Sequence, residues 1–247
     1  MPIWHCPCIC KNSELNLARI GLLLEDLEWV KDIAHCFKEK DYSINIINSH
    51  KNGCTIVCPE GELIIGRSDY APGVAVALEA LHELSVSTVY RIGTCGGYLS
   101  ETKIGEIVCC SAAIRGEGTS TCYIRDRGFP AVGDHAELER FGRLLRLGRT
   151  RVHNGILWTT DGRVVGPYEP ARIQEMKTHN VAGVEMETAA FYIVAHRLGM
   201  RAASASVIID LPESDGKFSA VASGSAEKIS LGLYVCFRSI PMLLTDK

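Results

Sequence analysis

Short apolar runs that alternate with amphipathic stretches constrain the fold of this chain more than any other feature. Strand-like runs occur at residues 18–24, 54–58, 61–66, 87–93, 105–114, 153–160 and 202–210. Helical patterns occur at residues 27–39, 73–84, 136–148, 182–199 and 225–243. Strands that are apolar on both faces and separated by helices are typical of a sheet covered on two sides. We therefore predict an α/β fold, a three-layer α/β/α sandwich with a mainly parallel, mixed central sheet, in a single domain over residues 1–247.

Charge and hydropathy argue against nucleic acid and membrane partners. The net charge is −3, and 22% of the residues are charged. The locally basic stretch 140–151 has its arginines at helical spacing, which is typical of a solvated helix face. The N-terminus lacks the basic start and apolar run of a signal peptide, and we find no apolar stretch long enough to span a bilayer. We expect a cytoplasmic protein.

The eleven cysteines give only a weak metal signal. Cys6, Cys8 and Cys10 alternate near the N-terminus, but the chain has no pair of C-x-x-C knuckles. Most other cysteines fall in apolar runs, where a free thiol behaves as a small core residue. We expect no metal and no cofactor. An N-terminal metal or disulfide cluster that includes His5 is the alternative.

Polar residues gather where the predicted strands end. The ends of four strands carry Arg91 and Gly93, then Arg115, then Thr160, Asp161 and Arg163, and finally Asp210. In sheets of this kind, ligands collect at the carboxyl ends of the strands. These residues together therefore predict a binding site.

The helical pattern over 182–199 begins with two carboxylates. Glu187 heads an apolar stripe that continues through Phe191 and Val194, whereas Glu185 has mixed stripe partners. Acidic residues in a first turn favour the positive end of the helix dipole, and for Glu185 this role and a functional role both stay open. An ionised group on a buried stripe needs a partner, so Glu187 is the better candidate for a functional role.

Four motifs in order give a resemblance to a known family. The stretches are "RIGTCGG", "AAIRGEGTS" followed by "GFPAVGD", "GVEMETAAF" and "VIID", which lie within residues 64–222. Their order and spacing resemble the nucleoside phosphorylase superfamily. That superfamily includes purine nucleoside and uridine phosphorylases, as well as hydrolytic nucleosidases that act on AMP or methylthioadenosine.

The resemblance implies a role for each matching residue. Arg91, Thr94 and the turn at Gly93 match the phosphate site, and Met186 and Glu187 match the ribose site, with Glu185 tuning that pocket. Asp210 matches the acid that protonates or hydrogen-bonds N7 of a leaving purine. The implied reaction is cleavage of the N-glycosidic bond of a purine nucleoside by phosphorolysis, which yields the free base and ribose 1-phosphate. Phosphate is then the co-substrate, and the implied assembly is a homodimer or a hexamer of dimers.

The sequence departs from the phosphorylase pattern after the first strand. Phosphorylases carry Gly-Asp-Pro-x-Arg there, but this chain reads "LLLEDLEWV", with Glu25 or Leu24 in place of the glycine and Trp29 in place of the arginine. Arg67 or Arg115 is a candidate to replace the missing charge.

Water is the alternative nucleophile. Hydrolytic nucleosidases carry acidic residues after the first strand, and Glu25 or Glu28 is a candidate to orient the water. Thr160, Asp161 and Arg163 also resemble the Thr-Thr-Asp-x-Arg of AMP nucleosidases, in which Arg163 would hold a 5′-phosphate. Hydrolysis of AMP or a related purine nucleotide is therefore the second hypothesis. A non-catalytic nucleoside- or metal-binding protein on this scaffold is the third.

Overall fold

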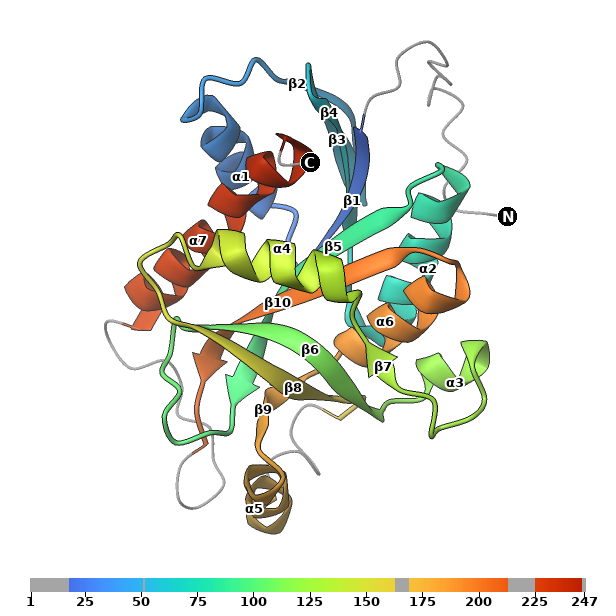
Figure 1. Ribbon diagram of the computed structural model, residues 1–247, viewed down its shortest axis with the longest axis vertical. Coiled ribbons are helices and arrows are strands. Elements are labelled where there is room, and N and C mark those ends of the chain that lie inside the picture. The colour runs from blue at the N-terminus through green and yellow to red at the C-terminus, as the bar shows by residue number, and fades with distance from the viewer. Residues whose placement is uncertain (1–17, 51, 163–168, 213–224, 246–247) are drawn as a thin grey trace.

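The computed structural model describes residues 18–50, 52–162, 169–212 and 225–245 and contains one extended mixed sheet (Figure 1). Its strands are β1 (Ala18–Leu24), β2 (Asn45–His50), β3 (Gly53–Cys58), β4 (Gly61–Arg67), β5 (Thr88–Gly97), β6 (Ile107–Gly116), β7 (Ala131–Val132), β8 (Val152–Thr160), β9 (Val181–Glu185) and β10 (Arg201–Asp210). The order along the sheet is β10-β6-β8-β9-β5-β1-β4-β3-β2, with β7 paired to β6.

The sheet closes on itself around β5. This strand pairs in parallel with β1 and β10 and antiparallel with β9, so β10, β6, β8, β9 and β5 form a ring. The mixed sheet predicted from the sequence is confirmed, although antiparallel pairings are as common as parallel ones among the described strands. The carboxyl ends of β1, β5 and β10 consequently lie next to one another.

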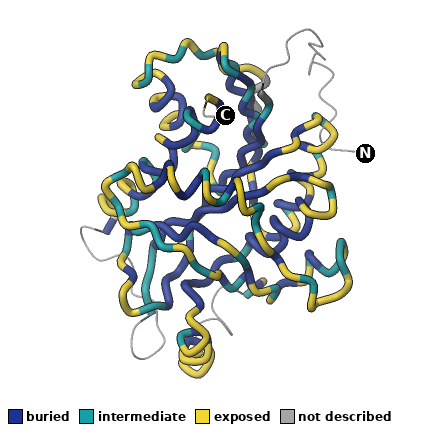
Figure 2. The backbone as a smooth tube through the Cα atoms, viewed as in Figure 1, coloured by how far each residue is buried: buried dark blue, intermediate teal, exposed yellow. Residues whose placement is uncertain are grey.

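Helices cover both sides of the sheet, as predicted (Figures 1 and 2). One side carries α1 (Trp29–Lys38), α4 (His135–Leu145) and α7 (Ser225–Thr245). The other carries α2 (Tyr70–Glu83), α3 (Thr119–Tyr123) and α6 (Thr188–Arg197), while α5 (Pro170–Thr178) packs beside β9. Each side has its own buried apolar cluster, so the sheet is dry on both faces, as its apolar strands require.

The helix predicted at 182–199 is shorter than expected. Its first residues form the strand β9, and α6 begins only at Thr188. The apolar run Val181–Val184 is buried between β8 and β5, and a short buried run cannot be assigned to helix or strand by periodicity alone. The predicted end is confirmed, because Gly199 follows the helix with φ of +71°.

Helix α7 corrects the expectation that no stretch is long enough to cross a bilayer. By length and composition alone, its 21 residues pass that test. Half of the tested window is buried inside the protein, and the helix packs against α1 and α4. Those contacts are typical of a core helix in a soluble protein.

The cysteines of the described residues are core residues. Cys36, Cys54, Cys58, Cys95, Cys109, Cys110 and Cys236 are buried free thiols, and Cys122 is exposed. Within the described ranges, no group of three or more His, Cys, Asp or Glu side chains is placed to hold a metal ion. Cys6, Cys8, Cys10 and His5 lie outside the described residues.

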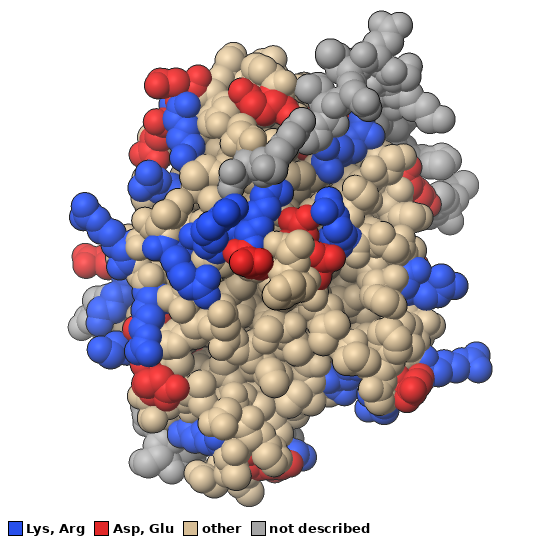
Figure 3. Space-filling view, in the orientation of Figure 1, with Lys and Arg blue, Asp and Glu red and all other residues tan. Residues whose placement is uncertain are grey.

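The basic stretch at 140–151 makes contacts within the protein. Arg140 donates to the Leu243 carbonyl at 2.7 Å, and Arg146 donates to the Asn154 side chain at 2.8 Å. Basic side chains gather on the face shown in Figure 3, with acidic side chains among them. The arginines therefore belong to a mixed helix surface.

Candidate active site

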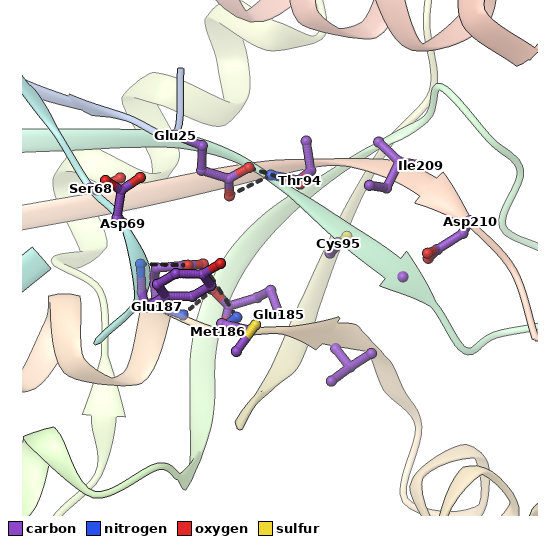
Figure 4. Close-up of a pocket in the computed structure, with 13 residues that line it drawn as sticks. Glu25, Ser68, Asp69, Thr94, Cys95, Glu185, Met186, Glu187, Ile209 and Asp210 are labelled. Atoms are coloured by element: carbon purple, nitrogen blue, oxygen red, sulfur yellow. Dashed lines mark hydrogen bonds between the residues drawn. The ribbon is translucent and has the colours of Figure 1, made fainter. Parts of the chain in front are cut away.

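One cavity is lined by six of the candidate residues, Glu25, Thr94, Glu185, Met186, Glu187 and Asp210 (Figure 4). It measures about 290 Å³ and lies beyond the carboxyl ends of β1, β4, β5, β9 and β10. Its lining consists of Glu25, Ser68, Asp69, Tyr70, Thr94, Cys95, Gly96, Val184, Glu185, Met186, Glu187, Ile209 and Asp210. Five of these residues are acidic, and none of the described lining residues is Lys, Arg or His.

Arg91 lies in the interior of β5 and is fully buried. Its Nη2 donates to Glu25 Oε1 and to Glu187 Oε2, both at 2.6 Å, and lies 3.6 Å from Glu185 Oε2. A buried guanidinium is stable only with anionic partners, and here three carboxylates surround it. Arg91 is therefore the fixed cation that holds the acidic cluster together.

Glu25 follows β1 and accepts hydrogen bonds from Thr94, near the end of β5. Its Oε1 accepts from the Thr94 N–H and its Oε2 from Thr94 Oγ1, each at 2.8 Å (Figure 4). Gly93 makes this approach possible, because a Cβ there would lie 2.2 Å from Glu25 Oε1. Burial raises the pKa of the Glu25 carboxyl, an effect that Arg91 and the Thr94 hydrogen bonds oppose.

Glu187 joins the cavity to α2 and α6. Besides Arg91, its carboxylate accepts from the N–H of Tyr70 at 3.1 Å and of Met186 at 3.2 Å. Tyr70 has φ of +56°, a conformation that is uncommon for a bulky side chain and that aims its N–H at Glu187. Burial raises the pKa of Glu187 to about 8, Arg91 opposes the rise, and Glu185 and Glu25 add to it.

Glu185 serves the start of α6. Its Oε2 accepts from the N–H of Glu187 and from the N–H and hydroxyl of Thr188, and its Oε1 accepts from the Thr159 hydroxyl. Both oxygens are thus engaged by the protein, although the residue borders the cavity. This geometry agrees with a role for Glu185 at the start of the helix, and its place in the cavity lining leaves its role in tuning the ribose pocket a prediction.

Asp210 ends β10 and borders the same cavity as Glu187 (Figure 4). It pairs in register with Gly96 after an irregularity at Ile208, which re-aims the end of the strand. Met186 lies between Glu185 and Glu187 in the lining. Cys95 is also in the lining, but burial raises the pKa of its thiol well above the usual range, so the thiol stays neutral.

A family model described as "Phosphorylase superfamily" matches residues 16–233. The chain belongs to the phosphorylase superfamily. This membership confirms the family that the motif order predicted, and it supports an enzyme of the nucleoside phosphorylase type, a class of pentosyltransferases.

Named relatives of this superfamily member differ in substrate. A guanosine phosphorylase of Halorubrum lacusprofundi is 29% identical over 185 residues, covering 74% of this chain and 69% of the relative. A uridine phosphorylase of Thermococcus kodakarensis is 33% identical over 143 residues (53% and 51%). A DeoD-type purine nucleoside phosphorylase of Hahella chejuensis is 28% identical over 148 residues (60% and 62%). The matches thus span from about half to about two thirds of these relatives.

The fold also matches solved structures of the superfamily. A uridine phosphorylase from Vibrio fischeri superposes with a TM-score of 0.78 at 18% identity, covering 94% of each chain. At this identity the likeness establishes the fold alone.

The two arginines considered as replacements for the missing phosphorylase arginine lie elsewhere. Arg67 is half exposed and pairs with Asp69 at 2.8 Å. Arg115 donates to Ser120 and to the carbonyls of Ile124, Asp126 and Phe129, so it holds the loop after α3. Neither borders the cavity, so the structure does not bring either arginine to the place of the missing one.

Of the two acidic candidates after β1, only Glu25 borders the cavity. Glu28 is exposed, pairs with Lys31 on α1 and does not border the cavity, so the structure does not bring it to the site. Trp29 packs against Phe237 of α7 with ring centroids 5.7 Å apart. The position matched to the phosphorylase arginine thus faces the helix layer.

The predicted pocket at the end of β8 is separate from this cavity. Thr160 Oγ1 accepts from the Gly162 N–H, and Asp161 accepts from the Gly118 N–H at 2.9 Å. Neither Thr160 nor Asp161 borders the cavity, so the structure does not bring them to the ribose site. Arg163 lies outside the described residues.

Sequence reasoning missed the segment after β4. Ser68, Asp69 and Tyr70 all border the cavity, and the buried Ser68 hydroxyl makes no hydrogen bond within the described residues. The signal was the polar "RSDY" that follows the strand "GELIIG". The Ser68 hydroxyl is therefore a buried polar group beside the cavity.

Proposed function

We propose that this protein cleaves the N-glycosidic bond of a purine nucleoside by phosphorolysis, releasing the free base and ribose 1-phosphate. The observation that carries this proposal is the shared cavity of Met186, Glu187 and Asp210, which come from different strand ends. A sugar held at Met186 and Glu187 leaves room for a base towards Asp210. The proposal goes further than the family, whose named members act on purines or on uridine.

Cleavage of the glycosidic bond needs an acid beside the leaving base and a carboxylate beside the sugar. An oxygen of phosphate attacks C1′ as the C1′–N9 bond breaks, and the bonding electrons pass to the purine. Asp210 supplies a proton or a hydrogen bond to N7, which neutralises the leaving base. Glu187 accepts hydrogen bonds from the ribose hydroxyls, and its charge stabilises the oxocarbenium-like sugar.

Phosphate as the nucleophile is supported by the retained Arg91 and Thr94 and by the names of the relatives. The preference for a purine over uridine rests on Asp210, since a protonated purine N7 needs an acid there. Both choices belong to the proposal.

Hydrolysis is the second candidate function, because one observation favours it. Glu25 accepts from Arg91 and Thr94, the donors that match the phosphate site, and it borders the cavity, where it would orient a water molecule. A 5′-phosphate requirement has less support, since Thr160 and Asp161 lie away from the cavity. A non-catalytic binding protein is disfavoured by the family membership.

Base release from a substrate panel tests these functions. The purified protein is incubated with guanosine, inosine, adenosine, AMP and uridine, with and without phosphate. We expect purine release that requires phosphate and yields ribose 1-phosphate. Release from AMP without phosphate would establish the hydrolytic alternative, and release from uridine alone would overturn the purine assignment.

We also propose a cytoplasmic location, and a homodimer or a hexamer of dimers. The proposed assembly rests on the resemblance to the family. Light scattering coupled to size-exclusion chromatography measures the assembly directly. A monomeric mass at micromolar concentration would contradict the assembly.

A further inference from the structure

Arg91 and Thr94, the hydrogen-bond donors that match the phosphate site, already donate to the side chain of Glu25. Glu25 accepts one hydrogen bond from Arg91 and two from Thr94, at 2.6 to 2.8 Å. A carboxylate and a phosphate each present at least two anionic oxygens that can accept hydrogen bonds from such donors. Glu25 therefore takes the place that a phosphate would take on these groups.

Charge in the site prevents ionised Glu25 and phosphate from sharing that place. Arg91 is surrounded by Glu25, Glu185 and Glu187, and the described lining of the cavity adds two more acids and no cation. A phosphate that entered beside ionised Glu25 would add a further anion around one guanidinium in a partly dehydrated site. Like charges at such short range are strongly unfavourable.

We propose that Glu25 is an internal competitor for phosphate, so that its carboxylate must leave the Arg91–Thr94 donors before phosphate binds. The inference rests on the proposed function for its role in the reaction, but phosphate binding itself can be measured without a nucleoside. Glu25 is able to leave, because it lies in the connection after β1 and its side chain is 22% exposed on the cavity side. Arg91 then keeps Glu187 as a partner at 2.6 Å, so it is not left unpaired. Glu25 thereby determines which nucleophile the site accepts.

Titration calorimetry with inorganic phosphate tests the competition. Glu25→Ala removes the competitor, and we expect phosphate to bind about tenfold more tightly, or better, than to the unmodified protein. Glu25→Gln keeps an acceptor oxygen but loses the charge, so its affinity should be intermediate. Glu28→Gln is the matched control, because Glu28 is three residues away, exposed and paired with Lys31, and its affinity should equal that of the unmodified protein.

A double variant locates the bound phosphate. Adding Thr94→Val to Glu25→Ala removes the Thr94 hydroxyl from the proposed phosphate site. It should abolish most of the gain in phosphate affinity. If Glu25→Ala does not fold, Glu25→Gln decides alone. Equal or weaker phosphate binding by the Glu25 variants would overturn the inference, as would a gain that survives Thr94→Val.

The substrate panel tests the proposed function, and its outcome is independent of the phosphate-binding test. Tighter phosphate binding without any nucleoside cleavage would uphold the competition and reject the proposed function. Phosphate-dependent cleavage with no change in phosphate affinity in the variants would do the reverse.

Discussion

Arg91 organises the site at the scale of single residues. A guanidinium with no exposed surface is costly to bury, and the cost is offset by Glu25 and Glu187, each at 2.6 Å. Burial raises the pKa of Glu25 and of Glu187, and the contacts with Arg91 oppose that rise. The chemistry of the sugar pocket therefore depends on a cation that does not border the cavity.

Asp210→Asn tests the acid for the leaving base. An amide cannot donate a catalytic proton, so we expect kcat for a purine nucleoside to fall by roughly 100-fold or more, with little change in KM. Steady-state kinetics on guanosine or inosine measure both constants. Asp126→Asn, on the exposed loop after α3, is the control and should keep full activity. An unchanged kcat in Asp210→Asn would remove Asp210 from the mechanism.

Gly93→Ala tests the close approach of Glu25 to β5. The added Cβ would lie 2.2 Å from Glu25 Oε1 and 2.6 Å from both Arg91 Nη atoms. We expect a loss of about 1–3 kcal/mol in the free energy of unfolding, together with loss of activity. Urea unfolding measures the change. Gly73→Ala in α2 is the control, since its Cβ would meet only ordinary contact at 3.6 Å, and equal stability of the two variants would contradict the packing.

The pH dependence of nucleoside turnover tests the coupling between Glu187 and Glu25. Burial raises the pKa of Glu187 to about 8, Arg91 opposes this, and Glu185 and Glu25 raise it further. Ionised Glu187 is the form that accepts hydrogen bonds from the ribose hydroxyls. We therefore expect kcat/KM to rise with pH through a midpoint near 8.

Removing the neighbouring carboxylate gives the sign of that coupling. Glu25→Gln takes away one of the charges that raise the pKa of Glu187, so the midpoint should move to lower pH. Glu28→Gln should leave it in place. A midpoint that is the same in all three proteins would show that Glu25 and Glu187 are not coupled.

At the scale of elements, the junction of β9 and α6 shows the limit of the sequence pattern. The sequence pattern correctly identified Glu187 as a buried charge. It also extended the predicted helix back to residue 182, over residues that form the strand Val181–Glu185. Whether a short buried run is strand or helix depends on its neighbours, here β8 and β5, which lie far away in the sequence. Long strands such as β1, β6 and β10 were predictable because their apolar runs are long and well bounded.

Glu185→Ala tests the role of Glu185 at this junction. The N–H groups of Glu187 and Thr188 would lose their acceptor, and we expect a loss of about 1–3 kcal/mol in the free energy of unfolding. Thermal and urea unfolding measure it. Glu83→Ala, at the exposed end of α2, is the control. Unchanged stability with a raised KM for nucleoside would instead assign Glu185 to the sugar.

At the scale of the whole molecule, the sheet order creates the site. Because β5 lies between β1 and both β10 and β9, the segments that follow these strands meet at one cavity. The sequence predicted which strand ends carry polar residues, but not which strands are neighbours. It therefore identified Glu25, Glu187 and Asp210 and equally suggested Arg67, Arg115 and Asp161, which the topology places elsewhere.

The origin of the oxygen on the sugar product tests phosphorolysis of a purine nucleoside most directly. The protein is incubated with guanosine or inosine in ¹⁸O-labelled phosphate and ordinary water, and the sugar is analysed by mass spectrometry. Phosphorolysis predicts ribose 1-phosphate that retains all of the label, including the oxygen on C1′. Free ribose without label would show that water attacks the sugar and would contradict it.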